Sequence, residues 1–272
     1  MVYEWVGVLA GVLLIAALAL IAVRARAIDK SGALTGSLIT FATFISGGFS
    51  WLFVTVVFFV VSSVLTRFRY DYKLSIGSAQ EKGGTRSWPN TLANGLISAV
   101  AATAYLVFRQ EIFAIAFLGA VAVAMSDTIA TEVGLLSNSK PRSITNPSKI
   151  VEPGTSGGVS ALGELAALAS SLGIGLLGLV IGVVPFGTSI VVPFALSVTF
   201  GGIVGTNIDS LLGGTIQAQR RCVQCDLVTE SKAHHGRPTA VVRGNRYVDN
   251  NVVNFVAIAL GSLVAIAIYL FA

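Results

Sequence analysis

The sequence predicts an all-α protein, a polytopic membrane helix bundle with about eight transmembrane helices and with its N and C termini outside. Of its 272 residues, 54% are hydrophobic and only 11% are charged, whereas soluble domains carry about 25% charged residues. The apolar stretches are long, as membrane helices require, and they lack the alternation of outer-membrane barrel strands. The length suits one compact unit, so we expect residues 1–272 to form a single transmembrane domain.

The expected helices follow eight uninterrupted apolar stretches. They cover residues 5–23, 32–47, 49–65, 91–108, 112–136, 159–184, 188–212 and 251–270. The second and third stretches are short and meet at Ser46, Gly47 and Gly48. The alternative for this pair is therefore one helix followed by a re-entrant segment.

The basic residues predict the orientation. All but one of the 18 Lys and Arg residues fall in the odd-numbered loops, and Arg109 is the exception. By the positive-inside rule, these loops face the cytoplasm and both termini face the outside. Arg24 and Arg26 follow the first stretch and no basic residue precedes it, which indicates a retained anchor rather than a cleavable signal. We expect an integral protein of a prokaryotic cell membrane with its active site facing the cytoplasm. Topology accounts for the net charge of +5, so nucleic acid is not an expected partner.

Acidic residues near the helix ends are the first candidate site. A carboxylate inside a bilayer is costly, so each one is a functional hypothesis. In the expected topology, five of them lie in the cytoplasmic third of the membrane: Asp127, Glu132, Glu164, Asp209 and Asp249. This convergence predicts one polar pocket open to the cytoplasm. The alternative for each residue is an interfacial side chain that extends to water.

We expect Mg²⁺ in this pocket. Ala130, Thr131 and Gly134 share the helix face of Asp127 and leave room for a ligand, while Glu132 points about 140° away. Clustered carboxylates beside many cations are typical of Mg²⁺ held between a protein and substrate phosphates. A proton or sodium pathway is the rival interpretation.

The loop 137–158 favours phosphate. It contains Lys140, Arg142 and Lys149, and it ends in a glycine-rich segment, 153–158, directly before an expected helix. Free N–H groups at a helix start bind anions, and basic side chains nearby strengthen that prediction. Thr155 or Ser156 is the expected helix N-cap. The alternative is an ordinary glycine-rich cap; the segment is not a Walker A loop.

The loop 216–248 carries a candidate zinc knuckle. It holds every cysteine and histidine of the chain, namely Cys222, Cys225, His234 and His235. Thiolates and imidazoles form the tetrahedral ligand set of Zn²⁺, and a cytoplasmic pair of cysteines is not expected to form a structural disulfide. His235 is the weakest of the four candidates, because adjacent histidines seldom reach one metal. The alternative is a free thiol pair beside surface histidines.

Five separated motifs resemble one family of membrane proteins. They cover residues 126–134, 141–145, 153–158, 209–213 with Gln217, and 249–254, and a weaker match covers 92–95. The chain is similar to the integral-membrane family that includes plant phytyl-phosphate kinase and animal transmembrane protein nineteen. A fainter similarity, through Ser126, Asp127, Ala130 and Gly134, reaches phosphatidate cytidylyltransferases and dolichol kinases. Family members often carry a cysteine at the position of His235.

The resemblance implies a kinase that transfers the γ-phosphoryl group of CTP, or of another nucleoside triphosphate, to a phytyl or polyprenyl monophosphate. In this hypothesis Asp127, Asp209, Asp249 and Glu132 are the catalytic residues. The three aspartates hold Mg²⁺, and Glu132 belongs to the same motif as Asp127. The remaining expected substrate-binding residues lie in the loop 137–158 and in the asparagine motifs. They are Lys140, Arg142, Lys149, Gly154, Thr155, Ser156, Gly157, Gly158, Asn94, Asn250, Asn251 and Asn254.

Two alternatives remain open at this point. The same site would serve a cytidylyltransferase that attacks the α-phosphate of CTP and makes a CDP-lipid. The carboxylates would also serve a carrier of lipid or anion that is coupled to an ion.

Overall fold

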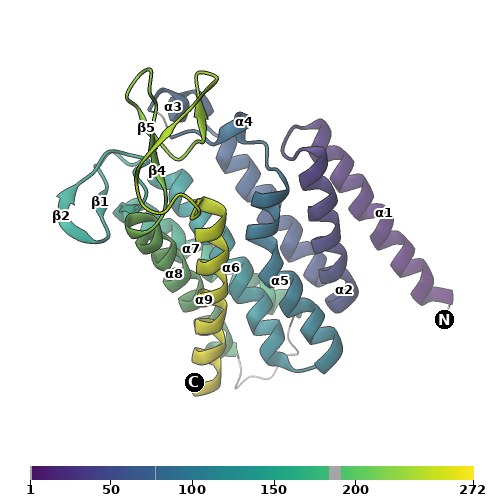
Figure 1. Cartoon of the computed structure of the whole chain (residues 1–272). Coiled ribbons are helices and arrows are strands. Elements are labelled where there is room, and N and C mark those ends of the chain that lie inside the picture. Colours follow the sequence, from purple (N-terminus) through teal and green to yellow (C-terminus); the bar gives the residue numbers. More distant parts are fainter. Residues whose placement is uncertain (1, 77, 184–190) are drawn as a thin grey trace.

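The computed structural model describes residues 2–76, 78–183 and 191–272, and it is a helix bundle (Figure 1). In this part of the chain, seven helices are long and apolar enough to cross a membrane. They are α1 (Val2–Arg24), α2 (Lys30–Arg67), α5 (Trp88–Phe108), α6 (Glu111–Gly134), α7 (Ala161–Val180), α8 (Val191–Thr215) and α9 (Asn250–Phe271). Two short helices, α3 (Tyr70–Ser75) and α4 (Glu81–Gly84), join α2 to α5. The predicted class, an all-α membrane bundle, is confirmed.

Helix α2 is a hairpin of two membrane passes. Gly48 has φ 67° and ψ −154°, a conformation that glycine adopts without the steric cost of a side chain. The hydroxyls of Thr43 and Thr55 lie 3.4 Å apart although they are 12 positions apart in sequence, whereas a straight helix would separate them by about 18 Å. At the far end, Arg67 Nη1 donates to Ala25 O at 2.7 Å. Both ends of α2 therefore lie on one side, and the described helices make eight passes, as the two apolar stretches predict.

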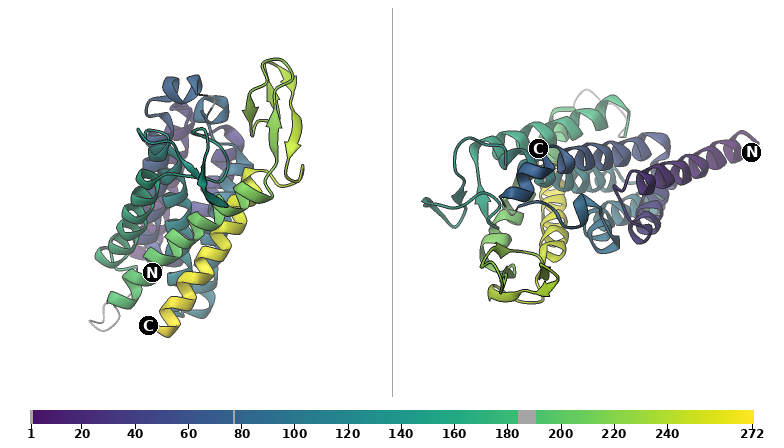
Figure 2. Two further views of the ribbon diagram at one scale, coloured as in Figure 1. Left: turned by 90° about the vertical axis from the view of Figure 1, so that its left-hand side faces the viewer. Right: turned by 90° about the horizontal axis from the view of Figure 1, so that it is seen from above.

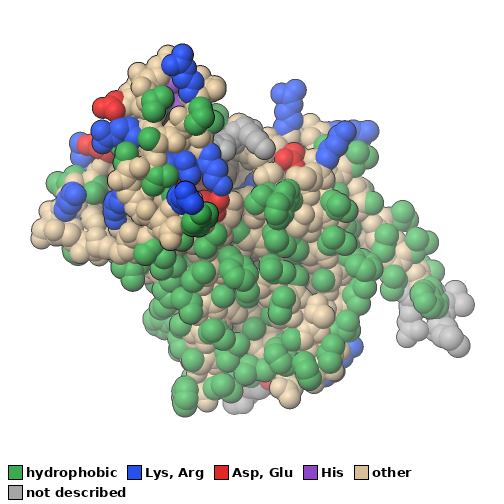
Figure 3. Space-filling model, in the orientation of Figure 1, with side chains coloured by type: hydrophobic (Ala, Val, Ile, Leu, Met, Phe, Trp, Pro, Cys, Tyr) green, Lys and Arg blue, Asp and Glu red, His purple; other side chains and the backbone are tan. Residues whose placement is uncertain are grey.

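Both termini lie at one end of the bundle, and α3, α4 and the strands lie at the other (Figure 1). We call that second end the loop side. In the space-filling view, Lys and Arg side chains gather on the loop side and hydrophobic side chains cover the body below it (Figure 3). This arrangement matches the separation of charge that the sequence predicts.

Helix α6 is the centre of the core. Its Ile115, Phe117 and Leu118 are fully buried, and Trp51 of α2 stacks on Phe117 with ring centroids 4.2 Å apart. Helices α8 and α9 pack on it and on each other through glycine, since a Cβ at Gly261 of α9 would lie 2.5 Å from Val123 of α6 and 2.7 Å from the carbonyl oxygen of Gly201 of α8. Small residues allow such close approach of membrane helices.

Three small antiparallel sheets stand on the loop side, and an all-α prediction does not contain them (Figure 2). Their strands are β1 (Arg142–Ser143), β2 (Asn146–Ile150), β3 (Gly158–Val159), β4 (Gln219–Arg221), β5 (Val228–Thr229), β6 (Ala233–His234), β7 (Arg237–Pro238) and β8 (Ala240–Arg243). The strand orders are β2-β1-β3, β5-β4-β8 and β6-β7.

The structure corrects the expected start of α7. The predicted helix 159–184 begins later, because Gly158 and Val159 pair with Ser143 and Arg142 as strand β3. The N-cap is Ser160, whose Oγ accepts from Gly163 N at 3.1 Å, and not Thr155 or Ser156. The glycine-rich segment therefore leads into a strand and does not point its N–H groups along a helix axis. The expected boundaries at 184 and 188 lie outside the described residues.

Candidate functional site

A small, tightly closed pocket with four polar residues in its wall lies where four helices meet. Asn94 of α5, Asp127 of α6, Asp209 of α8 and Asn254 of α9 line it, above Val123, Ala124, Ala257 and Ile258. In one orientation of its amide, Asn254 donates to Asp209 Oδ2 at 3.0 Å. In the other, it donates to Asn94 Oδ1 at 3.4 Å. We call these four polar residues the acidic pocket.

Hydrogen bonds between α6 and α8 set the position of both carboxylates. The hydroxyls of Ser126 and Thr206 lie 2.8 Å apart, and both side chains are buried. Asp127 follows Ser126 directly, and Asp209 lies almost one turn after Thr206. Since this polar contact fixes the two helices against each other, it also fixes the two carboxylates on the wall of one pocket.

Glu230 is a third carboxylate near this pocket, and the sequence reasoning missed it. Its charge acts on both Asp127 and Asp209. It projects from the loop between β5 and β6, and its Oε1 accepts from Ser156 Oγ at 2.6 Å. The available signal was its place between the cysteines and the histidines, which ties it to a folded loop rather than to an exposed linker.

The other predicted carboxylates lie elsewhere. Glu132 is buried and forms an ion pair with Lys73 Nζ at 2.5 Å. Glu164 accepts from Asn207 Nδ2 at 3.1 Å. Asp249 caps α9 and pairs with Lys232 at 3.0 Å. Of the five carboxylates expected in one pocket, the structure therefore brings together Asp127 and Asp209.

The pair of Glu132 and Lys73 joins the α2–α5 connection to the core. Lys73 also donates to Leu65 O at 2.7 Å, at the end of α2. Arg86, outside the membrane passes, is buried nearby. Burial lowers the pKa of Arg86 to about 10, while the negative charge of Glu132 acts to raise it. The guanidinium therefore stays charged near neutral pH, and Glu132 faces two cations.

Two of the predicted phosphate-binding cations, Arg142 and Lys149, lie in the β1–β2 hairpin, and Lys140 lies just before it. Lys140 pairs with Glu152 at 2.9 Å, and both side chains are exposed. Arg142 Nη1 donates to Pro147 O at 2.8 Å, and Lys149 is exposed. None of the three lines the acidic pocket in the described part of the chain. Their phosphate role stays a prediction.

The glycine-rich segment reaches closer to the site than these cations do. Gly157 has φ 78°, and a Cβ there would lie 2.4 Å from Gly214 Cα and 2.8 Å from Ser210 O on α8. Ser210 is next to Asp209, and Ser156 contacts Glu230. Gly154 packs on Ser78 and Gly158 on Thr155, so these two glycines shape the turn. Asn250 and Asn251 occupy the first turn of α9, and Asn250 O faces Asn254.

A mainly apolar cavity of about 330 Å³ lies between α1, α2 and α5. Its walls include Ile15, Ile39 and Phe59, and Arg67, Arg86, Asn90 and Asn94 are among its polar lining residues. Among the described residues, the buried Oδ1 of Asn90 finds no hydrogen-bond partner. Asn94 lines both the cavity and the acidic pocket. The polar site thus adjoins a space suited to a hydrocarbon chain.

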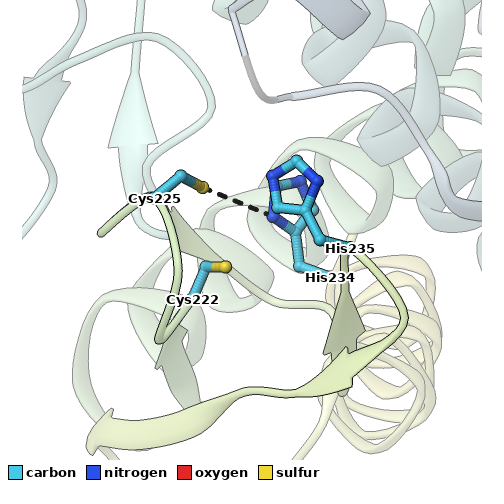
Figure 4. A group of neighbouring side chains, drawn as sticks. All are labelled: Cys222, Cys225, His234 and His235. Carbon is cyan, nitrogen blue, oxygen red and sulfur yellow. Dashed lines mark hydrogen bonds between the residues drawn. The ribbon is translucent and has the colours of Figure 1, made fainter.

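The four predicted zinc ligands come together in the structure. Their ligand atoms all lie within 4.8 Å of one another (Figure 4). The backbone N–H of Gln224 donates to Cys222 Sγ at 3.4 Å. This hydrogen bond is the largest of several, with others from Cys225 and His234, that together lower the pKa of the Cys222 thiol to about 6. The thiolate is the form that binds metals.

Known proteins resemble nearly the whole chain. A family model described as "Integral membrane protein DUF92" matches residues 13–262. "Protein PGR" of Arabidopsis thaliana is 33% identical over 275 residues, covering 91% of this chain and 92% of that protein. An uncharacterized membrane protein of Methanocaldococcus jannaschii is 30% identical over 259 residues, covering 95% of this chain and 92% of that protein. "Protein VTE6, chloroplastic" of Arabidopsis thaliana is 24% identical over 239 residues, covering 83% of this chain and 62% of that protein. No solved structure matches. These relatives confirm the family resemblance that the motifs predict.

Proposed function

We propose that the chain, which belongs to the integral membrane protein family DUF92, is a membrane phosphotransferase. It would transfer the γ-phosphoryl group of CTP, or of another nucleoside triphosphate, to an isoprenoid monophosphate. One observation carries the proposal: the acidic pocket and the apolar cavity share Asn94 as a common wall. A lipid with a phosphate head has this same succession of polar and apolar parts.

The donor atoms of the acidic pocket suit Mg²⁺. Asp127 and Asp209 offer carboxylate oxygens, and Asn94 and Asn254 offer amide oxygens. Mg²⁺ takes one or two protein carboxylates and leaves its other positions to phosphate and water. When bound, the ion would neutralise charge on the transferred phosphoryl group. Asp249, paired with Lys232 at the start of α9, would join this set only if that ion pair opened.

The chain's own residues would position the two substrates. The isoprenoid chain would occupy the cavity between α1, α2 and α5, with Arg86 and Arg67 close to its phosphate. The nucleotide would enter from the loop side, beside Ser156 and Lys232. Phosphoryl transfer needs mainly alignment and charge stabilisation, and it needs no covalent intermediate on the protein. The loop side would then face the cytoplasm, in agreement with the positive-inside rule.

A second candidate keeps the same pocket. The residues Ser126, Asp127, Ala130 and Gly134 are similar to the motif of phosphatidate cytidylyltransferases, which favours attack on the α-phosphate and a CDP-lipid product. A radiolabel on the γ-phosphate of CTP distinguishes the two reactions. The kinase transfers that phosphate to the lipid, whereas the cytidylyltransferase releases it in pyrophosphate.

The test is a product assay on the purified protein in lipid nanodiscs, with Mg²⁺ and phytyl or polyprenyl monophosphate. Label from γ-³²P CTP in a lipid diphosphate is the expected result. Label from the cytidine in the lipid would replace the kinase with the cytidylyltransferase. Absence of both products, with ATP, GTP and UTP also tried, would contradict an enzyme and leave the ion-coupled carrier.

A further inference from the structure

We infer that Cys222, Cys225, His234 and His235 bind one structural Zn²⁺, which fixes the 216–248 loop above the acidic pocket. The inference concerns this loop and does not depend on which reaction the pocket performs. The ligand atoms of the four residues lie within 4.8 Å of one another, and the side chains point toward a common centre (Figure 4). In tetrahedral zinc the ligand atoms are about 3.3–3.8 Å apart, so small side-chain rotations would complete the site.

The two cysteines lie on a turn with the geometry of a zinc knuckle. Strands β4 and β5 pair as Arg221 with Val228, and the turn between them carries Cys222 and Cys225. Gln224 N–H donates to Cys222 Sγ at 3.4 Å, and Asp226 closes the turn with φ 60° and a bond from its N–H to Cys222 O at 3.1 Å. A backbone donor to sulfur stabilises a thiolate, which is the ligand form.

A second hairpin presents both histidines on the same side. His234 pairs with Arg237 in the β6–β7 ladder, and His235 and Gly236 form the turn with φ 52° and φ 71°. The left-handed backbone at His235 rotates its ring toward that of His234, and the ring centroids lie 4.1 Å apart. A two-residue hairpin turn with positive φ at both central positions is a common hairpin loop, so the loop length itself sets this backbone. It removes the objection that adjacent histidines do not reach one metal.

The loop has little else to hold its shape. Most side chains in β5–β8 are exposed, and both cysteines are free. A small unit without a sizeable apolar core needs a metal or a disulfide for stability. Between the two ligand pairs lie Glu230, which contacts Ser156 at 2.6 Å, and Lys232, which pairs with Asp249 at 3.0 Å. Zinc would therefore fix the segment that reaches the acidic pocket.

The first measurement is metal analysis of the full-length protein, purified in detergent without chelator. We expect about one zinc per chain in the wild type and in the matched control Gln224→Ser, whose exposed side chain lies between the two cysteines. The double variant Cys222→Ser with Cys225→Ser should lose the zinc. Absence of zinc from the wild type, or retention by the double variant, would overturn the inference.

The second measurement reports the loop itself. Trypsin should cut after Lys232 or Arg243 about tenfold faster after chelation, because cleavage follows the population of the open loop. Adding Zn²⁺ back to the chelated wild type should restore protection, so the result does not depend on whether the cysteine variant folds. Equal cleavage rates with and without zinc would contradict the role in fixing the loop.

Discussion

Asp127 and Glu132 are carboxylates on the same helix, α6, yet they occupy opposite electrostatic settings. Glu132 is buried against Lys73, with the Arg86 guanidinium nearby. Asp127 lines a pocket with a second carboxylate, Asp209, and within the described residues it forms no ion pair with Lys or Arg. If both carboxylates served only to stabilise α6, each would be expected to have a basic partner. The difference indicates that Glu132 anchors the fold while Asp127 is available to a ligand.

The largest expected effect is on the stability that Glu132 supports. Glu132→Gln leaves Lys73 charged and buried without its partner, and breaking such a pair costs about 3–5 kcal/mol. Thermal unfolding in detergent should show this loss. The double variant Lys73→Met with Glu132→Met removes both charges and should recover most of the stability.

Activity of that double variant distinguishes anchoring from catalysis. If Glu132 only anchors α3 to α6, γ-phosphoryl transfer returns together with stability. A stable double variant without activity would give Glu132 a role in the reaction and would break the contrast with Asp127.

A smaller effect is expected at the apolar cavity. Gly36 lines it, and a Cβ there would meet Thr91 and Ile28 only at ordinary contact distances of 3.5 and 3.6 Å. Gly36→Phe should therefore fold and fill the cavity. We expect about a tenfold lower kcat/KM with long-chain isoprenoid monophosphates, equivalent to about 1.4 kcal/mol, and little change with short-chain ones.

The matched control for the cavity is Gly173→Phe, because a Cβ at Gly173 meets nothing within 4 Å. This variant should keep the wild-type preference for chain length. Equal loss for short and long chains in Gly36→Phe would contradict the cavity as the chain site.

The smallest effect is expected at Lys140. Its pair with Glu152 is exposed on both sides, and such pairs contribute about 0–1 kcal/mol. Lys140→Ala should therefore leave the melting temperature nearly unchanged. A raised KM for the nucleotide would support the phosphate contact that the sequence predicts, and an unchanged KM would remove it.

Long apolar stretches made most of the fold predictable. Both halves of α2 were recognisable because Gly47 and Gly48 interrupt an otherwise apolar run, and only a hairpin places Thr43 beside Thr55. The small sheets were not predictable, because strands as short as β1 and β3 carry no periodic pattern. Gly158 and Val159 form a strand only because β1 lies beside them.

The candidate site was predictable in part, for a related reason. A carboxylate in an apolar helix is visible in a sequence, so Asp127 and Asp209 stood out. The residue that interacts with such a carboxylate cannot be identified from the sequence when that residue comes from a distant loop. Lys73, which neutralises Glu132, and Glu230, which acts on Asp127 and Asp209, both lie in connections whose path depends on the tertiary fold.

The most direct test of the contrast on α6 is the rate of γ-phosphoryl transfer by Asp127→Asn, measured beside its thermal stability. Asparagine keeps the size and hydrogen bonding of the side chain and removes its charge. The account predicts about a 10²-fold or larger loss of rate, typical of a lost electrostatic contact to a transition state. Stability should be unchanged or raised, because an unpaired carboxylate in the membrane costs about 2.5 kcal/mol or more. Near-normal transfer by Asp127→Asn would contradict the account.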